Sequence, residues 1–94
     1  MARVHVAFST AMAGAPVLAS NPQAAETLTS GATAVESTIT AGNSHVAIIT
    51  VDGGPVWVAI GKTAAANEAW LMLDGQTREF GLVAPGSKIS VLDA

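Results

Sequence analysis

The sequence predicts an all-β fold, a small β-sandwich or jelly-roll-like barrel of seven to eight short antiparallel strands with an extended N-terminal segment. Short runs of apolar and β-branched residues recur along the chain. Turn-forming clusters separate these runs at the spacing of roughly 8–12 residues that is typical of sandwiches and barrels. At residues 24–26, where alanines gather, the neighbouring β-branched residues still favour a strand over a helix.

The first part of the chain, up to about residue 41, predicts strands of weak periodicity. Residues 3–8 alternate between apolar and polar side chains, and residues 25–29 do so again. A third run, residues 33–40, has apolar points at Val35 and Ile39. We expect a strand in each of these three runs.

The extreme N-terminal part has a character of its own. We divide the chain into an N-terminal strand or arm over residues 1–22 and a β-sandwich over residues 23–94, with one domain overall. The apolar content of residues 1–22 is too high for a solvated tail, which favours an arm that packs on a neighbouring subunit. The alternatives are a mobile tail, or an ordinary first strand with its loop.

The second part of the chain carries the clearer strand signals. The segment 52–55, Asp-Gly-Gly-Pro, is a strong turn signal, and the run after it is expected to return as the next strand. Residues 62–68 are small and polar and predict a loop or one helical turn. We expect strands over five runs: 44–51, 55–60, 70–73, 78–83 and 88–92.

The composition favours a protein that works inside an assembly. Half of the residues are hydrophobic, but only 12% are charged and 4% aromatic, whereas soluble domains average about 25% charged residues. A chain of 94 residues also buries only about 60–65% of the surface that its unfolded form exposes. A thin core under a weakly charged surface would gain from a second chain to pack against.

Charge and hydropathy argue against two classes of partner. The net charge is −3, and the four basic residues are scattered along the chain, so no stripe that could follow a phosphate backbone is present. No run approaches the roughly 20 apolar residues of a membrane span. We therefore expect neither nucleic acid nor a membrane as partner.

No catalytic, cofactor or metal site emerges from the sequence. Gly61-Lys62-Thr63 resembles the end of a phosphate-binding loop, but Val56 stands where that motif requires a glycine. His5 and His45 lack further ligands at metal-binding spacing. No facing carboxylate pair and no Gly-x-Ser-x-Gly nucleophile motif is apparent. We predict a non-enzymatic protein without a cofactor.

Two tryptophans and the N-terminal apolar residues are the candidates for contact with a partner. Trp57 and Trp70 could stack on a sugar or anchor a protein interface. The alternative is that at least one of them fills the core. The interface candidates are Val4, Val6, Phe8, Pro16, Val17, Leu18, Trp57 and Trp70.

The run from residue 44 to residue 94 carries a family resemblance. Its elements are the strand 46–51, the turn and strand 52–61, the run 70–75, Phe80-Gly81-Leu82 and the closing Pro85-Gly86-Ser87-Lys88-Ile89-Ser90-Val91. This pattern resembles small accessory virion proteins of tailed bacteriophages. The resemblance covers a little over half of the chain and implies a compact β-module attached to the virion, on the capsid surface or in the neck or tail.

These observations converge on a functional hypothesis. We expect a non-enzymatic structural protein of a tailed-phage virion, most simply a capsid decoration or cement protein that binds the major capsid protein and stabilises its lattice. It would assemble in the host cytoplasm and act as a homo-oligomer, with a trimer favoured. The alternatives are a neck or tail component that binds other virion subunits, and a carbohydrate-binding module that uses Trp57 and Trp70.

Overall fold

The structure is a computed structural model that describes residues 1–10, 24–42, 45–81 and 83–94. Within these ranges the chain is all-β and contains no helix. The eight strands are β1 (Arg3–Thr10), β2 (Ala24–Thr29), β3 (Val35–Glu36), β4 (His45–Asp52), β5 (Val56–Ile60), β6 (Trp70–Met72), β7 (Thr77–Phe80) and β8 (Ile89–Asp93).

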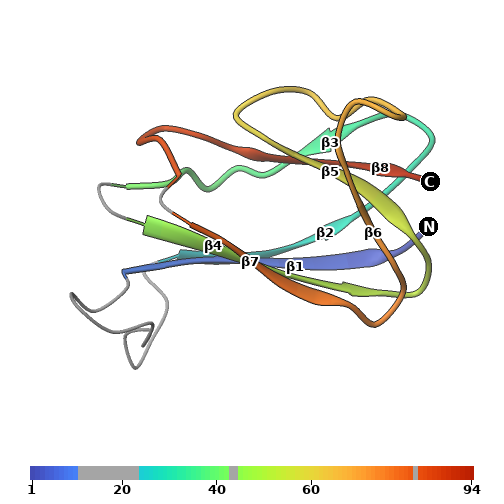
Figure 1. Cartoon of the computed structure of the whole chain (residues 1–94), viewed down its shortest axis with the longest axis horizontal. Helices are drawn as coiled ribbons and strands as arrows, with labels where there is room; N and C mark the ends of the chain where they lie inside the picture. Colours follow the sequence, from blue (N-terminus) through green and yellow to red (C-terminus); the bar gives the residue numbers. More distant parts are fainter. Residues whose placement is uncertain (11–23, 43–44, 82) are drawn as a thin grey trace.

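Two four-stranded antiparallel sheets lie face to face as a sandwich (Figure 1). The first sheet has the order β2-β1-β4-β7, and the second has the order β3-β8-β5-β6. The pairing confirms the predicted small antiparallel β-sandwich of seven to eight strands. The two ends of the described chain come together on the right of Figure 1.

The strand pairs are nested around the loop between β5 and β6. β5 pairs with β6, β4 with β7, and β3 with β8, so a single long ribbon is folded across both sheets. β1 lies between β2 and β4 and pairs with both. Nested pairing of this kind is the arrangement of a jelly roll, and it places residues from distant parts of the chain at the same end of a sheet.

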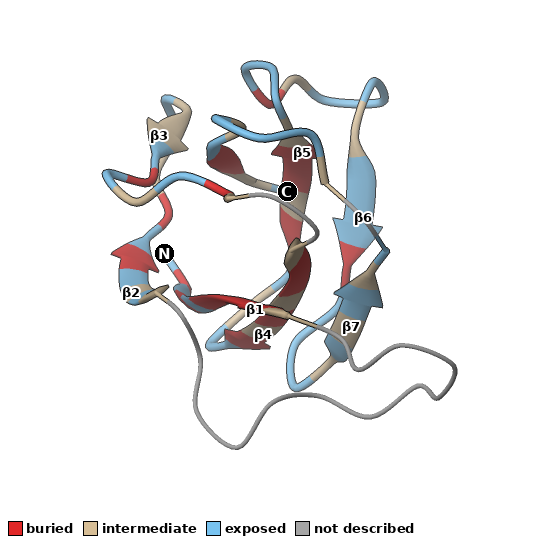
Figure 2. Cartoon of the chain, turned by 90° about the vertical axis from the view of Figure 1, so that its left-hand side faces the viewer, coloured by how far each residue is buried: buried red, intermediate tan, exposed pale blue. Residues whose placement is uncertain are grey.

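The core is formed by the inward side of each strand's alternation. Val4, Val6 and Phe8 on β1 are 0% exposed, and they face Val56 and Val58 from the second sheet, which are also 0% exposed. Complete burial of such a side chain contributes about 1.5–3 kcal/mol. In Figure 2 the buried residues, in red, follow the central strands, whereas β6 and β7 at the sheet edges are mostly exposed or half-buried.

The first strand is therefore a central strand of the sandwich. Residues 3–10, predicted as part of an N-terminal strand or arm, form β1 between two neighbours. Val4, Val6 and Phe8, named as interface candidates, have side chains that lie between the sheets with 0% exposure and form part of the core. The other N-terminal candidates, Pro16, Val17 and Leu18, lie outside the described residues.

The turn at residues 52–55 joins the two sheets and does not make a hairpin. β4 already has β1 and β7 as neighbours, so β5 crosses to the second sheet and pairs with β8 and β6. Gly53 and Gly54 have φ of 104° and 145°, values that residues with a Cβ rarely adopt. The turn signal was correct, but the prediction that the next strand returns beside β4 was wrong.

One further expectation needs correction. Of the strand predicted over residues 33–40, only β3 forms, because the amides of Thr38 and Ile39 donate to the Glu26 carboxylate and not to a neighbouring strand. Residues 62–68, predicted as a loop or one helical turn, form a loop. Phe80 on β7 is half-buried and packs against the core, and Leu82 lies outside the described residues.

Candidate binding surfaces

The outer face of the second sheet exposes a group of large apolar side chains. Trp57 lies between Leu71 on β6 and Leu92 on β8 in the pairing register, so the three side chains form one row across three strands. Leu71 is 43% exposed, Leu73 just beyond β6 is 57% exposed, and Trp57 and Leu92 are half-buried. We call these four residues, Trp57, Leu71, Leu73 and Leu92, the outer patch.

The loop from Gly61 to Ala69 covers the remaining part of this face. The amide of Ala64 donates a hydrogen bond of 2.9 Å to Ser90 Oγ. Ala64 is 4% exposed, and beneath the loop Ala59 is 2% and Ser90 is 1% exposed. One end of the sheet is thus shielded by the chain's own loop, and the outer patch at the other end is left open.

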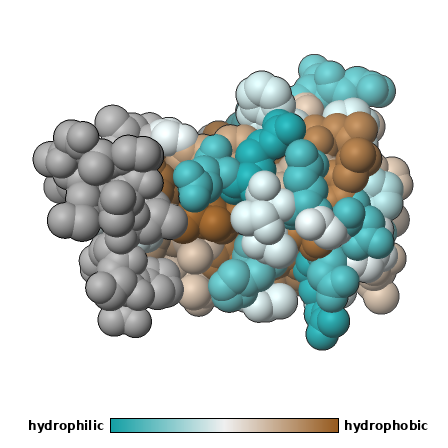
Figure 3. Space-filling model, turned by 60° about the horizontal axis from the view of Figure 1, so that its bottom comes forward, coloured by the Kyte–Doolittle hydropathy of each residue, from teal (hydrophilic) through white to brown (hydrophobic). Residues whose placement is uncertain are grey.

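The outer face of the first sheet has the opposite character. Thr27, His5, Thr50 and Thr77 lie in one register row across its four strands. His5 Nδ1 lies 3.2 Å from Thr27 Oγ1, and Thr50 Oγ1 lies 3.0 Å from Thr77 Oγ1. Figure 3, which brings the first sheet forward, shows teal and white residues over the middle of this face, with brown between them. The polar side chains of this row can hydrogen-bond water.

The two tryptophans lie on opposite sides of the second sheet. Trp70 pairs with Val58, which faces the core, whereas Trp57 pairs with Leu71 on the outside. Trp70 is 58% exposed because it lies at the open edge between the sheets, with its ring 5.6 Å from the Arg78 guanidinium and 6.4 Å from the Phe80 ring. The two indoles therefore form no common stacking platform for a sugar.

A polar cavity of about 460 Å³ lies at one end of the second sheet. Its walls are the loop 61–63 that follows β5, the turn 85–88 that precedes β8, and Glu36 on β3. Lys62 and Lys88 both line it, as do the hydroxyl-bearing residues Thr63 and Ser87. We call this space the polar cavity.

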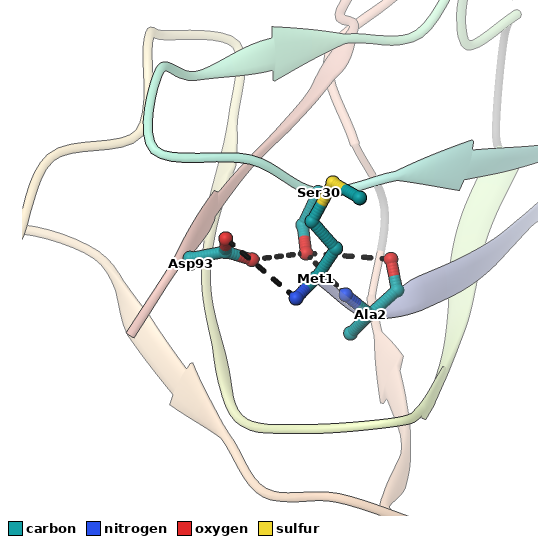
Figure 4. Close-up of polar contacts among 4 residues, drawn as sticks. All are labelled: Met1, Ala2, Ser30 and Asp93. Carbon is teal, nitrogen blue, oxygen red and sulfur yellow. Dashed lines mark hydrogen bonds and ion pairs between the residues drawn. The ribbon is translucent and has the colours of Figure 1, made fainter.

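Other polar side chains serve the fold. Ser30 Oγ accepts a 2.8 Å hydrogen bond from the Ala2 amide and contacts Asp93 Oδ1, and the Met1 amino group lies 3.9 Å from the Asp93 carboxylate (Figure 4). These contacts tie β1, β2 and β8 together where the ends of the chain meet. The network is structural because a hydrogen bond or ion pair within the chain already engages each of its polar groups.

The Glu26 carboxylate bridges from β2 to the segment after β3. It accepts hydrogen bonds from the Thr38 amide at 2.8 Å, from Thr38 Oγ1 at 3.0 Å and from the Ile39 amide at 3.3 Å. Partial burial raises the pKa of Glu26, but these hydrogen bonds to the ionised form outweigh it, and the net pKa lies below the ordinary 4.5. The partners of the Glu26 carboxylate among the described residues are Thr38 and Ile39, and neither is an acid that could form a catalytic pair with it.

The described residues contain no group of three or more His, Cys, Asp or Glu side chains that could hold a metal ion. His5 lies on the outer face of the first sheet, and His45 lies at the start of β4, where its Nδ1 accepts a hydrogen bond of 2.9 Å from the Gly42 amide. In the same part of the chain, no helix is long and apolar enough to cross a membrane.

Sequence reasoning named Trp57 but missed its neighbours in the outer patch. The signal was present at residues 71–73, where three large apolar residues follow one another. A strand alternates its side chains between two faces, so such a run must place apolar groups on both. The Met72 side chain lies in the core with 0% exposure, and the Leu71 and Leu73 side chains are exposed to solvent.

Comparisons with known proteins add no relative. A scan against protein-family models, a search of curated proteins and a search of solved structures each found no match to this chain.

Proposed function

We propose that the protein is a non-enzymatic structural component of a tailed-phage virion, a decoration or cement protein that binds the capsid shell through the outer patch. One observation supports this proposal above the others. Among the described residues, the two outer faces of the sandwich differ in chemistry: the second sheet leaves large apolar side chains, Leu71 and Leu73 among them, open to solvent, whereas the first sheet carries the row of Thr27, His5, Thr50 and Thr77.

The physical case for docking rests on the cost of this exposure. Exposed leucines beside a half-buried tryptophan gain about 25 cal/mol for each Å² of apolar surface removed from water, and grouped apolar side chains on a small soluble domain typically mark an interaction site. None of the four side chains in the outer patch carries a charge. The complementary surface is therefore an apolar, uncharged strip on a shell subunit.

The proposal includes self-association. With only 12% charged residues, the domain suits contact with other protein surfaces on most sides, and we propose a homo-oligomer, with a trimer matching the threefold positions of a capsid lattice. A stable contact buries roughly 800 Å² on each partner. Several linked copies on one particle would add avidity even where each contact is weak.

The test measures shell binding together with the mass of the protein in solution. Light scattering gives the oligomeric state, and co-sedimentation with shells of a tailed phage that encodes this chain gives the affinity. The double variant Leu71→Gln/Leu73→Gln should bind at least about tenfold more weakly, because two apolar contacts are replaced by amides. Its matched control is Ala25→Gln/Thr29→Gln, two exposed positions on the outer side of β2, which should bind like the wild type.

Other results would redirect or reject the proposal. A folded wild-type protein that does not sediment with shells rejects decoration. Binding to complete virions but not to isolated shells assigns the protein to the neck or tail. Equal weakening by both double variants would show that the outer patch is not the docking surface.

A further inference from the structure

Besides the outer patch, the surface of the second sheet has the polar cavity. The polar cavity lies where β5 ends and β8 begins, at the opposite end of the sheet from the outer patch. We propose that the polar cavity binds an oxyanion, a carboxylate or phosphate group, between Lys62 and Lys88. This site is additional to the proposed docking function and can be tested on the isolated protein.

Backbone contacts hold the walls of the cavity in place. The Gly61 amide donates to the Lys88 carbonyl at 2.9 Å, which ties the loop 61–63 to the turn 85–88. The turn is held in addition by the Ala41 amide, which donates to the Ser87 carbonyl at 2.9 Å, and by the Gly86 amide, which donates to the Ala41 carbonyl at 2.7 Å. A ligand would therefore meet walls that are already ordered, which reduces the entropic cost of binding.

One position in the wall of the cavity favours glycine because of its backbone conformation. Gly61 has φ of 78°, and a Cβ on it would lie 3.4 Å from Ser87 Oγ. A residue with a Cβ would strain the backbone at this φ, although its Cβ would meet the Ser87 hydroxyl at an ordinary van der Waals distance. This distance also shows that the Ser87 hydroxyl lies beside the loop that carries Lys62 and Thr63.

The cavity lining carries more basic than acidic side chains, whereas the whole chain is acidic. The chain has a net charge of −3, with four basic and seven acidic residues. Two of the four basic residues, Lys62 and Lys88, line the cavity, and Glu36 is the one acidic residue among its lining. The antiparallel pairing of Ile60 with Ile89 places these lysines at the same end of adjacent strands. Neither lysine takes part in an ion pair with another described residue.

The lining indicates the class of ligand. Lysine ammonium groups and hydroxyls donate hydrogen bonds to oxyanions, and the 460 Å³ volume suits a small ligand or one inserted acidic group. Thr63 Oγ1 donates a long hydrogen bond of 3.5 Å to Glu36 Oε1, and among the described residues neither lysine forms an ion pair with Glu36. The Lys-Thr pair after Gly61, which fails as a phosphate-binding loop by sequence, acquires its partner Lys88 only through the fold.

The experiment is an NMR titration of the 15N-labelled protein at constant pH and ionic strength, with sodium phosphate and sodium acetate as probes and sodium chloride as the reference. We expect saturable amide shifts confined to residues 61–63 and 85–88. The double variant Lys62→Gln/Lys88→Gln should raise the dissociation constant for phosphate and acetate at least tenfold. Arg3→Gln, which removes an exposed cation on the other sheet, is the matched control and should leave the constant unchanged.

Two results would overturn the proposal. One is the absence of saturable shifts for phosphate and acetate alike, and the other is an equal response in the wild-type protein and the lysine double variant. Thermal unfolding of each variant shows that the fold is retained. The lysine variant then enters the shell assay, where weakened binding identifies acidic side chains of the shell as the source of the oxyanion and unchanged binding identifies a free anion. Shell binding that fails altogether rejects the proposed function without affecting the titration.

Discussion

At the scale of single residues, Ser30 shows how a small polar group stabilises a thin core. Its side chain is 1% exposed at the end of β2, where its hydroxyl lies between the Ala2 backbone and the Asp93 carboxylate. The Ser30 amide also donates to the Ala2 carbonyl at 2.8 Å. A buried donor that loses its acceptor costs more than an average hydrogen bond contributes.

Ser30→Ala should lower the free energy of unfolding by about 1–3 kcal/mol, because the buried Ala2 amide loses the acceptor that its hydrogen bond requires. Urea unfolding at an unchanged m-value measures this difference. Thr33→Ala, at an exposed loop position, is the control and should stay within about 0.5 kcal/mol of the wild type. A Ser30 variant as stable as the control would show that the network contributes nothing to stability.

At the scale of the elements, different contacts bridge the two sheets at the two sides of the sandwich, where β2 and β3 are the edge strands on one side and β7 and β6 on the other. On one side the Glu26 carboxylate on β2 holds the segment after β3. On the other side Arg78 extends from the inward face of β7, an edge strand, and lies over Trp70 of β6. An inward-pointing charge on an edge strand also discourages pairing with a further strand.

The Glu26 contacts predict a dependence of stability on pH. The folded-state pKa of Glu26 is lowered below 4.5, so its contribution is present above the unfolded-state pKa and is lost as the pH falls through the folded-state pKa. At pH 7 the free energy of unfolding of the wild type should exceed that of Glu26→Gln by about 0.5–1.5 kcal/mol. The difference should shrink below about pH 4.5.

Urea unfolding at several pH values between 7 and 3 measures this difference. Glu79→Gln provides the matched control, because Glu79 is exposed on the outer face of β7. Its effect should remain within about 0.5 kcal/mol. A Glu26 difference that is equally large at pH 7 and pH 3 would contradict the assigned role of the carboxylate.

At the scale of the whole molecule, nested pairing makes stability depend on contacts between distant parts of the chain. β1 and β4 are the inner strands of the first sheet, and β8 and β5 are those of the second. Each has two hydrogen-bonded neighbours, whereas β3 and β6 lie at edges and have two and three residues. Strands of the first kind open only when the sandwich opens.

Native-state hydrogen exchange should therefore show the slowest amides in β1, β4, β5 and β8, with protection near the global free energy of unfolding. The amides of β3 and β6 should exchange first. The measurement is made at low protein concentration, where self-association does not protect the edges. Protection of β6 equal to that of β4 under these conditions would contradict the assignment of β6 as an open edge.

The amino-acid sequence by itself determined the fold class and the approximate position of most strands. These features are local, since β-branched density and alternation define a strand and Gly-Asp-Pro clusters define a turn. The sequence also named Trp57, which lies in the outer patch, and the lysine after Gly61, which lines the polar cavity.

Only the tertiary structure decided which strands pair and which face of each strand is buried. Val4 and Val6 were expected at an interface because the apolar content of residues 1–22 favoured an arm, whereas the fold places β1 between β2 and β4 with both side chains between the sheets. The turn at 52–55 could not reveal that β5 would join β8, because that pairing depends on residues far away in the chain. Lys62 and Lys88 form one site for the same reason: the pairing of β5 with β8 places their two loops at one end of the second sheet.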